Sequence, residues 1–182
     1  MDLRRTLRVS VILVFFLMRD AMSWRNQQRP THWWLRSHFR LKKPCKGGNL
    51  MKIDTNQCTV SNGKQKCEAK CNGWYTKHPT TSFQLVQLRR KKCIQFSDDL
   101  DRKFSLKAVN GTSVTFEKQR CTTESNFLFA EKRVGRLYQY LHTVGNTTLC
   151  LGVPGDCGVT LSLIRADGND RRCLFRKHRK RI

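Results

Sequence analysis

The chain has 182 residues, of which 38% are hydrophobic, so it has room for one domain of ordinary size and short tails rather than for a series of domains. Its 36 lysines and arginines against 13 aspartates and glutamates give a formal net charge of +23. A charge of this size attracts polyanions but carries no information about the fold. Nucleic acid, anionic membranes and sulfated polysaccharides are all candidate partners on charge alone. Which of them the protein meets depends on its cellular compartment.

Residues 1–23 have the pattern of a secretory signal peptide. Three arginines precede an apolar run over residues 9–18, which is too short to cross a bilayer as a helix. Ala21 and Ser23 then supply small residues at the two positions that signal peptidase reads. A buried helix fits the run less well, because nothing polar alternates within it. We therefore expect a secreted, extracellular protein without stable membrane insertion and without a nucleic-acid partner.

Residues 24–43 are basic and rich in tryptophan, show no regular hydrophobic period and include Pro30. They are predicted to form an N-terminal arm that docks loosely on the domain. Contact of this arm with a membrane surface or a glycan is the alternative. The domain itself is predicted over residues 44–176, followed by a basic C-terminal tail at 177–182.

Nine cysteines follow the signal peptide: Cys45, Cys58, Cys67, Cys71, Cys93, Cys121, Cys150, Cys157 and Cys173. In an oxidising compartment they are expected to form disulfides rather than to bind metal. The odd number leaves at least one thiol free or paired between chains, and the sequence does not give the connectivity. Cys67 and Cys71 have a spacing that suggests a zinc knuckle, but no matching pair of ligands accompanies them. We expect no metal and no cofactor.

The domain is predicted to be all-β, because short apolar or alternating runs are bounded by turn residues and no stretch has sustained helical spacing. Asn62-Gly63 predicts a tight hairpin turn, whereas residues 67–79 have the composition of a loop. The predicted strands are residues 50–54, 59–61, 83–88, 93–96, 104–109, 114–117, 127–131, 137–142, 149–153, 159–164 and 173–175.

A weak internal repeat organises these strands. Val114-Thr115-Phe116 recurs as Val159-Thr160-Leu161, and Trp74-Tyr75-Thr76 is a degenerate third copy. Three such units suggest a threefold all-β closure, in which pairing around a barrel removes exposed sheet edges.

Several segments, taken in order, resemble the fibroblast growth factor family. Residues 43–54 match its opening Cys-x-x-Gly-Gly turn and following apolar strand; further matches are Phe83–Val86, Phe104–Leu106, Phe129–Glu131 and Leu137–Tyr140. The resemblance implies a β-trefoil of three repeats of four short strands, and the nine cysteines of this chain make it cysteine-rich. The chain departs from the family pattern at Pro44 and Leu137, where tyrosines are expected, and in its additional cysteines. Residues 149–153 also resemble ricin-type lectin repeats, although the Gln-x-Trp ending of those repeats is missing.

The resemblance implies a secreted growth factor-like ligand that binds heparan sulfate and a fibroblast growth factor receptor-type tyrosine kinase. Arginine suits sulfate groups because its guanidinium makes bidentate contacts with oxyanions. The implied heparan sulfate site comprises Lys46, Asn49, Arg165, Arg171, Arg172, Arg176 and Lys177. Leu137, Tyr138 and Tyr140 are the implied receptor contacts, since aromatic anchors carry much of the energy of an interface. The alternative is a secreted trefoil lectin that binds sulfated glycans without activating a receptor.

The sequence shows no catalytic constellation, so we expect no enzyme. The five histidines are scattered, and the acidic cluster at residues 98–101 is interpreted as a solvated loop. Asn110 and Asn146 each begin a glycosylation sequon in a predicted turn, where a glycan does not disturb packing. A basic antimicrobial or nucleic-acid-binding protein is a third class, which the signal peptide and the cysteines disfavour.

Overall fold

Strand β4 (Phe83–Leu88) has the boundaries that the sequence predicts and shows how the chain forms its sheet. Phe83 and Leu85 are buried, whereas Gln84 and Val86 are partly exposed, which is the period-two pattern of a half-buried strand. The computed structural model describes residues 38–44, 50–73, 79–155, 159–165 and 168–179. All of them belong to one unit, Leu35–Ile182.

The described residues form twelve strands of one antiparallel sheet, joined in part by three short 3-10 turns. The strands are β1 (His38–Lys42), β2 (Leu50–Ser61), β3 (Lys64–Gly73), β4 (Phe83–Leu88), β5 (Lys91–Ser97), β6 (Lys103–Val109), β7 (Ser113–Lys118), β8 (Ala130–Val134), β9 (Leu137–Val144), β10 (Thr147–Gly152), β11 (Ser162–Ile164) and β12 (Arg176–Arg179). The 3-10 turns are η2 (Pro79–Thr81), η3 (Ser125–Phe127) and η4 (Arg171–Cys173).

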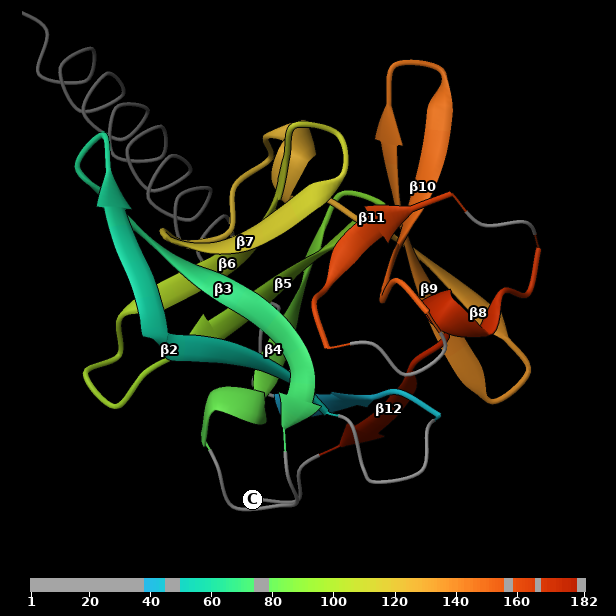
Figure 1. Cartoon of the computed structure of the whole chain (residues 1–182), viewed down its shortest axis with the longest axis horizontal. Helices are drawn as coiled ribbons and strands as arrows, with labels where there is room; N and C mark the ends of the chain where they lie inside the picture. Colours follow the sequence, from blue (N-terminus) through green and yellow to red (C-terminus); the bar gives the residue numbers. More distant parts are fainter. Residues whose placement is uncertain (1–37, 45–49, 74–78, 156–158, 166–167, 180–182) are drawn as a thin grey trace, which may run out of the picture. The chain divides into compact units, whose positions relative to one another are not determined.

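Strands β1 to β7 close into a seven-stranded antiparallel barrel (Figure 1). Their order around the barrel is β3-β2-β1-β4-β5-β6-β7, and pairing of β3 with β7, through Cys67 opposite Phe116, closes the ring. The other five strands lie outside it. Ser162 of β11 pairs with Ser113 of β7 and continues the sheet into β10, β9 and β8, whereas β12 pairs with β1.

The prediction of a β-trefoil made of three repeats of four strands is wrong. The protein is all-β, but its barrel has seven strands, all from residues 38–118, and the remaining five are outer strands. A local hydrophobic pattern identifies each short strand, but it does not specify which distant strand becomes its partner. The pairing of β3 with β7 is such a long-range choice. The trefoil part of the lectin alternative fails for the same reason.

Three strands lie where the sequence predicted none. Strand β3 falls largely in the stretch expected to be a loop, β1 falls within the segment expected to be an arm, and β12 includes the first residues of the predicted C-terminal tail. All three are polar, yet Cys67, Ala69 and Cys71 of β3 alternate inward and are buried. The hairpin at Asn62-Gly63 is confirmed: these residues have φ angles of 51° and 70°, and Ser61 pairs with Lys64, as expected for a two-residue turn with positive φ at both positions.

Aromatic side chains from neighbouring strands fill the barrel. Phe83 of β4 stacks on Phe116 of β7 with ring centroids 5.5 Å apart, and it lies 6.4 Å from Phe96 of β5. All three rings are almost fully buried. Burying an aromatic side chain of this size contributes about 1.5–3 kcal/mol relative to leaving it exposed.

Three disulfides confirm the expectation that cysteines of this chain are oxidised: Cys58–Cys67, Cys93–Cys121 and Cys150–Cys173. Cys71 lies in the core, where burial raises the pKa of its thiol to about 12 and keeps the thiol protonated at neutral pH. Cys45 and Cys157 lie outside the described residues. Within the described ranges, no helix is both long and apolar enough to span a bilayer.

Candidate polyanion-binding surface

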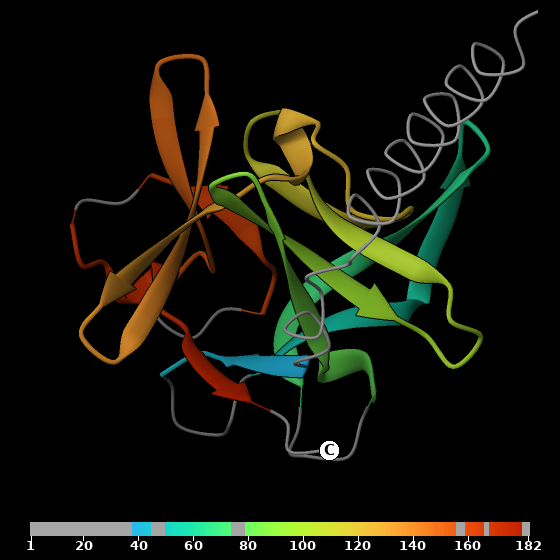
Figure 2. The same ribbon diagram turned by 180° about the vertical axis from the view of Figure 1, so that it is seen from behind.

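Strands β1 and β12 lie side by side as an antiparallel ribbon (Figure 2), and their register places four basic residues on one face. Arg40 is directly opposite His178, and Lys42 is directly opposite Arg176. Residues that face each other in an antiparallel pair lie on the same side of the sheet, as do residues two apart in one strand. Arg40, Lys42, Arg176 and His178 therefore form two adjacent rungs, which we call the basic ladder.

The other three cations of the ladder act on the imidazole of His178. Burial, followed by the positive charges of Arg176, Lys42 and Arg40, lowers the pKa of the imidazole below its usual 6.5. All three of these side chains belong to the basic ladder. The ladder is thus a concentrated positive surface on an antiparallel ribbon, which suits an anionic polymer better than a small buried ligand.

The other face of the ribbon is anchored to the protein. Leu41 is fully buried, and the side chain of Lys177 is only 16% exposed. Lys177 Nζ lies 2.9 Å from a carboxylate oxygen of Glu131, 4.1 Å from the centroid of the Tyr138 ring and 5.3 Å from that of the Phe39 ring. The ion pair and the aromatic contacts hold β12 against β8 and β9.

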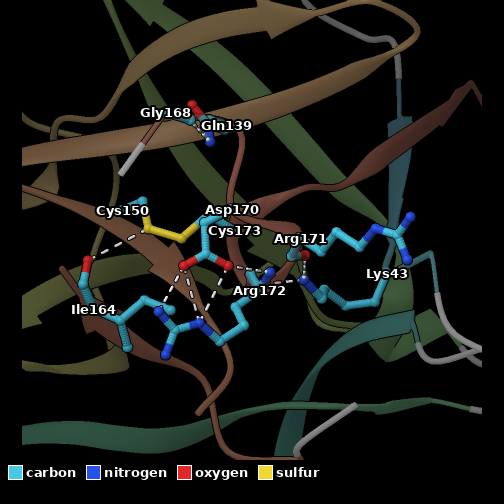
Figure 3. Close-up of polar contacts among 9 residues, drawn as sticks. All are labelled: Lys43, Gln139, Cys150, Ile164, Gly168, Asp170, Arg171, Arg172 and Cys173. Atoms are coloured by element: carbon cyan, nitrogen blue, oxygen red, sulfur yellow. Dashed lines mark hydrogen bonds and ion pairs between the residues drawn. A yellow bond between two sulfur atoms is a disulfide. The ribbon is translucent and has the colours of Figure 1, made fainter. Parts of the chain in front are cut away.

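The turn η4, which precedes β12, is held by its N-cap residue Asp170 and by Lys43, which follows β1 (Figure 3). The Asp170 carboxylate accepts hydrogen bonds from Arg172, at 2.9 Å from Nε and 2.6 Å from Nη2, and it also accepts the backbone N–H of Arg172 at 2.8 Å. These hydrogen bonds lower the pKa of Asp170 below its usual range. Lys43, at the end of β1, donates from Nζ to the carbonyl oxygens of Arg171 and Arg172 at 2.5 and 2.6 Å.

The residues predicted to bind heparan sulfate therefore differ in their surroundings. Arg165, Arg171 and Arg176 are exposed, whereas Arg172 is paired with Asp170 and Lys177 is packed against Glu131 and Tyr138. Lys46 and Asn49 lie outside the described residues. The reason for the contrast between Arg176 and Lys177 is that neighbours in a strand point to opposite faces.

Sequence reasoning missed Arg40, Lys42 and His178. A signal was present, because His38-Phe39-Arg40-Leu41-Lys42 alternates basic and apolar residues, as a strand with one basic face does. The tryptophan-rich, aperiodic composition of residues 24–43 as a whole predicts an arm instead. Its partner strand lies more than a hundred residues further along the chain, so nothing local indicated that the two basic faces would combine.

The three residues predicted to contact a receptor are not equally accessible. Leu137 and Tyr138 are half-buried in β9, but Tyr140 is fully buried and its ring lies 6.2 Å from Phe175. Burial and the nearby Glu131 carboxylate raise the pKa of Tyr140 well above 10. A fully buried ring cannot contact another protein unless the core opens, so Tyr140 acts in packing.

The two sequons lie at exposed turns. Asn110 occupies the turn between β6 and β7 and has a φ angle of 49°, and Asn146 occupies the turn between β9 and β10. Both residues are exposed.

A pocket of about 340 Å³ lies beside the Cys58–Cys67 disulfide. Its wall includes Thr115 of β7 and also Asn56 and Gln57 of β2. The last two lie where the pairing of β2 with β3 is interrupted by a shift in register. It contains none of the predicted site residues. Among the residues that the structure describes, no group of three or more His, Cys, Asp or Glu could hold a metal ion.

No protein-family model matches the chain, and no curated protein matches it.

Proposed function

We propose that the protein is secreted and binds heparan sulfate, or a glycan of similar sulfation, through the basic ladder. The observation that carries this proposal is the register of β1 and β12, which sets Arg40 opposite His178 and Lys42 opposite Arg176. Arg176 presents a guanidinium to solvent, and guanidinium groups bind sulfate oxygens in pairs.

The dimensions of the ladder favour a linear polyanion. Two residues of an antiparallel strand span about 7 Å, so the two rungs offer cationic sites at that spacing along the ribbon. The hydrogen bond from Lys43 to the Arg171 carbonyl holds η4 at the end of β1. The exposed Arg171 is thereby held near Lys42, the residue of the ladder that precedes Lys43. A chain with repeated sulfate groups can contact several of these cations at once.

The extracellular part of the proposal rests on two observations. The three disulfides are compatible with an extracellular protein, and residues 1–23 have the pattern of a signal peptide. Outside the cell, sulfated glycans are abundant polyanions, whereas nucleic acid is scarce.

Growth factor-like signalling through a receptor tyrosine kinase is the second part of the proposal. It rests on the resemblance of the sequence segments to the fibroblast growth factor family and on the half-buried Leu137 and Tyr138, without Tyr140. The competing function is glycan binding without receptor activation. Pull-down of receptor ectodomains with and without heparin, followed by an assay of receptor phosphorylation, separates the two.

The glycan proposal is tested by elution from a heparin column. The double variant Lys42→Ser/Arg176→Ser removes one rung, whereas Lys132→Ser/Arg133→Ser removes the same charge from exposed positions of β8. We expect the first variant to elute at clearly lower salt than the second, with both still folded by circular dichroism. Equal shifts would mean that only net charge matters, and an unchanged elution of the first variant would overturn the proposal.

A further inference from the structure

The two rungs of the basic ladder differ in one chemical respect. Lys42 and Arg176 carry fixed charges at neutral pH, whereas the other rung pairs Arg40 with His178, whose side chain is exposed. Histidine changes its charge near neutral pH, unlike lysine and arginine. One rung is therefore permanently dicationic, and the other gains its second charge only when His178 binds a proton.

The charged groups that face His178 come from both strands of the ribbon. They are Arg40 and Lys42 of β1 and Arg176 of its own strand, and all three are cationic. His38, the next residue on this face of β1, bonds through Nε2 to the Gln84 side chain of β4 at 3.2 Å. In the unliganded protein, partial burial and then the charges of Arg176, Lys42 and Arg40 disfavour the imidazolium.

We propose that Arg40 and His178 form a subsite for one sulfate group of the glycan, and that a sulfate binds there with uptake of a proton by His178. This inference rests on the proposed function. It adds that one pair of residues on the same surface binds a sulfate group and that pH regulates this binding. The proton comes from solvent and adds to the free imidazole nitrogen, so no covalent bond of the ligand changes.

The physical reason is a reversal of the local field. A bound sulfate offsets the repulsion from Arg40, Lys42 and Arg176, and its oxygens accept hydrogen bonds from the imidazolium. Binding therefore raises the pKa of His178, and by linkage protonation strengthens binding. The gain in affinity is complete below the pKa of the free protein, which lies under 6.5, and it is lost as the pH rises through the higher pKa of the complex.

The test measures the affinity for a size-defined heparin oligosaccharide at pH 5.5, 6.5 and 7.5 and at constant ionic strength. We expect the wild type to bind about two- to fivefold more tightly at pH 5.5 than at pH 7.5, the effect of one added surface ion pair. His178→Gln should bind weakly at all three pH values, and His178→Lys tightly at all three. His38→Gln, a change of the neighbouring histidine, should keep the wild-type pH dependence.

An independent readout is the NMR titration of the His178 imidazole with and without the oligosaccharide, in which the ligand should raise its pKa. The inference is overturned if His178→Gln retains the wild-type pH dependence, or if the ligand leaves the titration of His178 unchanged. In either case the protein still binds heparin, so the proposed function stands. If the wild type binds heparin at none of the three pH values, the proposed function itself fails.

Discussion

Lys43 Nζ lies 2.5 Å from the carbonyl oxygen of Arg171, across 128 residues of sequence. The lysine side chain is almost fully buried, and it also reaches the Arg172 carbonyl and lies over the Phe175 ring with 5.2 Å to its centroid. This contact fastens η4 to the end of β1, at the point where the ribbon begins. A buried ammonium thus positions the exposed basic residues without being part of the binding surface.

Replacing Lys43 by methionine should therefore destabilise the protein. The change keeps an apolar stem of similar length but removes two charge-assisted hydrogen bonds to backbone carbonyls, at a cost of about 2–3 kcal/mol. Urea unfolding measures this as a lower midpoint. Lys132→Met, at an exposed position of β8, is the matched control and should lie within about 0.5 kcal/mol of the wild type. Equal midpoints for the two variants would show that the Lys43 contact does not stabilise the fold.

Arg176 and Lys177 are adjacent in sequence but should respond differently to substitution. Lys177→Met loses the ion pair to Glu131 and the contact with Tyr138, and we expect it to lower stability by about 1–2 kcal/mol. Arg176→Met should leave stability almost unchanged but reduce the salt needed to elute the protein from heparin. Thermal unfolding and heparin elution, measured on both variants, check this contrast. A larger loss of stability for Arg176→Met would contradict the assignment of the two faces.

Glu117 should make stability depend on pH in the acidic range. Its side chain is 1% exposed and lies 3.0 Å from Lys107 Nζ and 3.1 Å from Lys64 Nζ. Burial acts to raise the pKa of Glu117, but the hydrogen bonds from Lys107 and Lys64 outweigh it, so the pKa falls below the usual 4.5.

Because the folded state has the lower pKa, the unfolded chain binds the proton first as the pH falls. The contribution of the ionised Glu117 to the free energy of unfolding is complete above pH 4.5. It is lost as the pH falls through the pKa that Glu117 has in the folded protein. We expect Glu117→Gln to be less stable by about 2 kcal/mol at pH 7 and to lose part of the acid dependence of the wild type. Urea midpoints between pH 3 and pH 7 measure both effects, and parallel pH curves for the two proteins would refute the prediction.

The disulfides should contribute differently to the free energy of unfolding, because they close loops of different length. Cys58–Cys67 closes a separation of 9 residues, and Cys93–Cys121 one of 28. Loop entropy gives about 2.6 and about 3.6 kcal/mol respectively. The double serine variant of Cys93 and Cys121 should thus lose about 1 kcal/mol more than that of Cys58 and Cys67. Urea unfolding of the two variants under non-reducing conditions tests this order, which a reversed ranking would contradict.

Both sequons should accept a glycan when the chain passes through a eukaryotic secretory pathway, because Asn110 and Asn146 are exposed at turns. Glycosidase treatment of the secreted protein should increase its electrophoretic mobility. Asn110→Gln and Asn146→Gln should each remove one step of that shift, and the double variant should show none. A mobility that the glycosidase leaves unchanged would contradict the prediction for both sites.

The sequence by itself determined the features that depend on near neighbours. The alternation of Phe83, Gln84 and Leu85 places β4 because side chains of a strand point alternately to its two faces. Asn62-Gly63 fixes a hairpin because few other residue pairs tolerate positive φ twice in succession. The short alternating runs likewise predicted an all-β chain, and composition predicted disulfides and a strongly positive charge.

Tertiary structure alone decided how these pieces combine. Cys67 meets Phe116 and closes a barrel of seven strands, not a trefoil, and Arg40 meets His178 to form a basic rung. The packing of β12 against β8 and β9 then turns Lys177 inward and its neighbour Arg176 outward, although both are cations in one run. Which strands pair depends on the free energy of the whole core, to which residues far apart in sequence contribute together, so no local pattern records it.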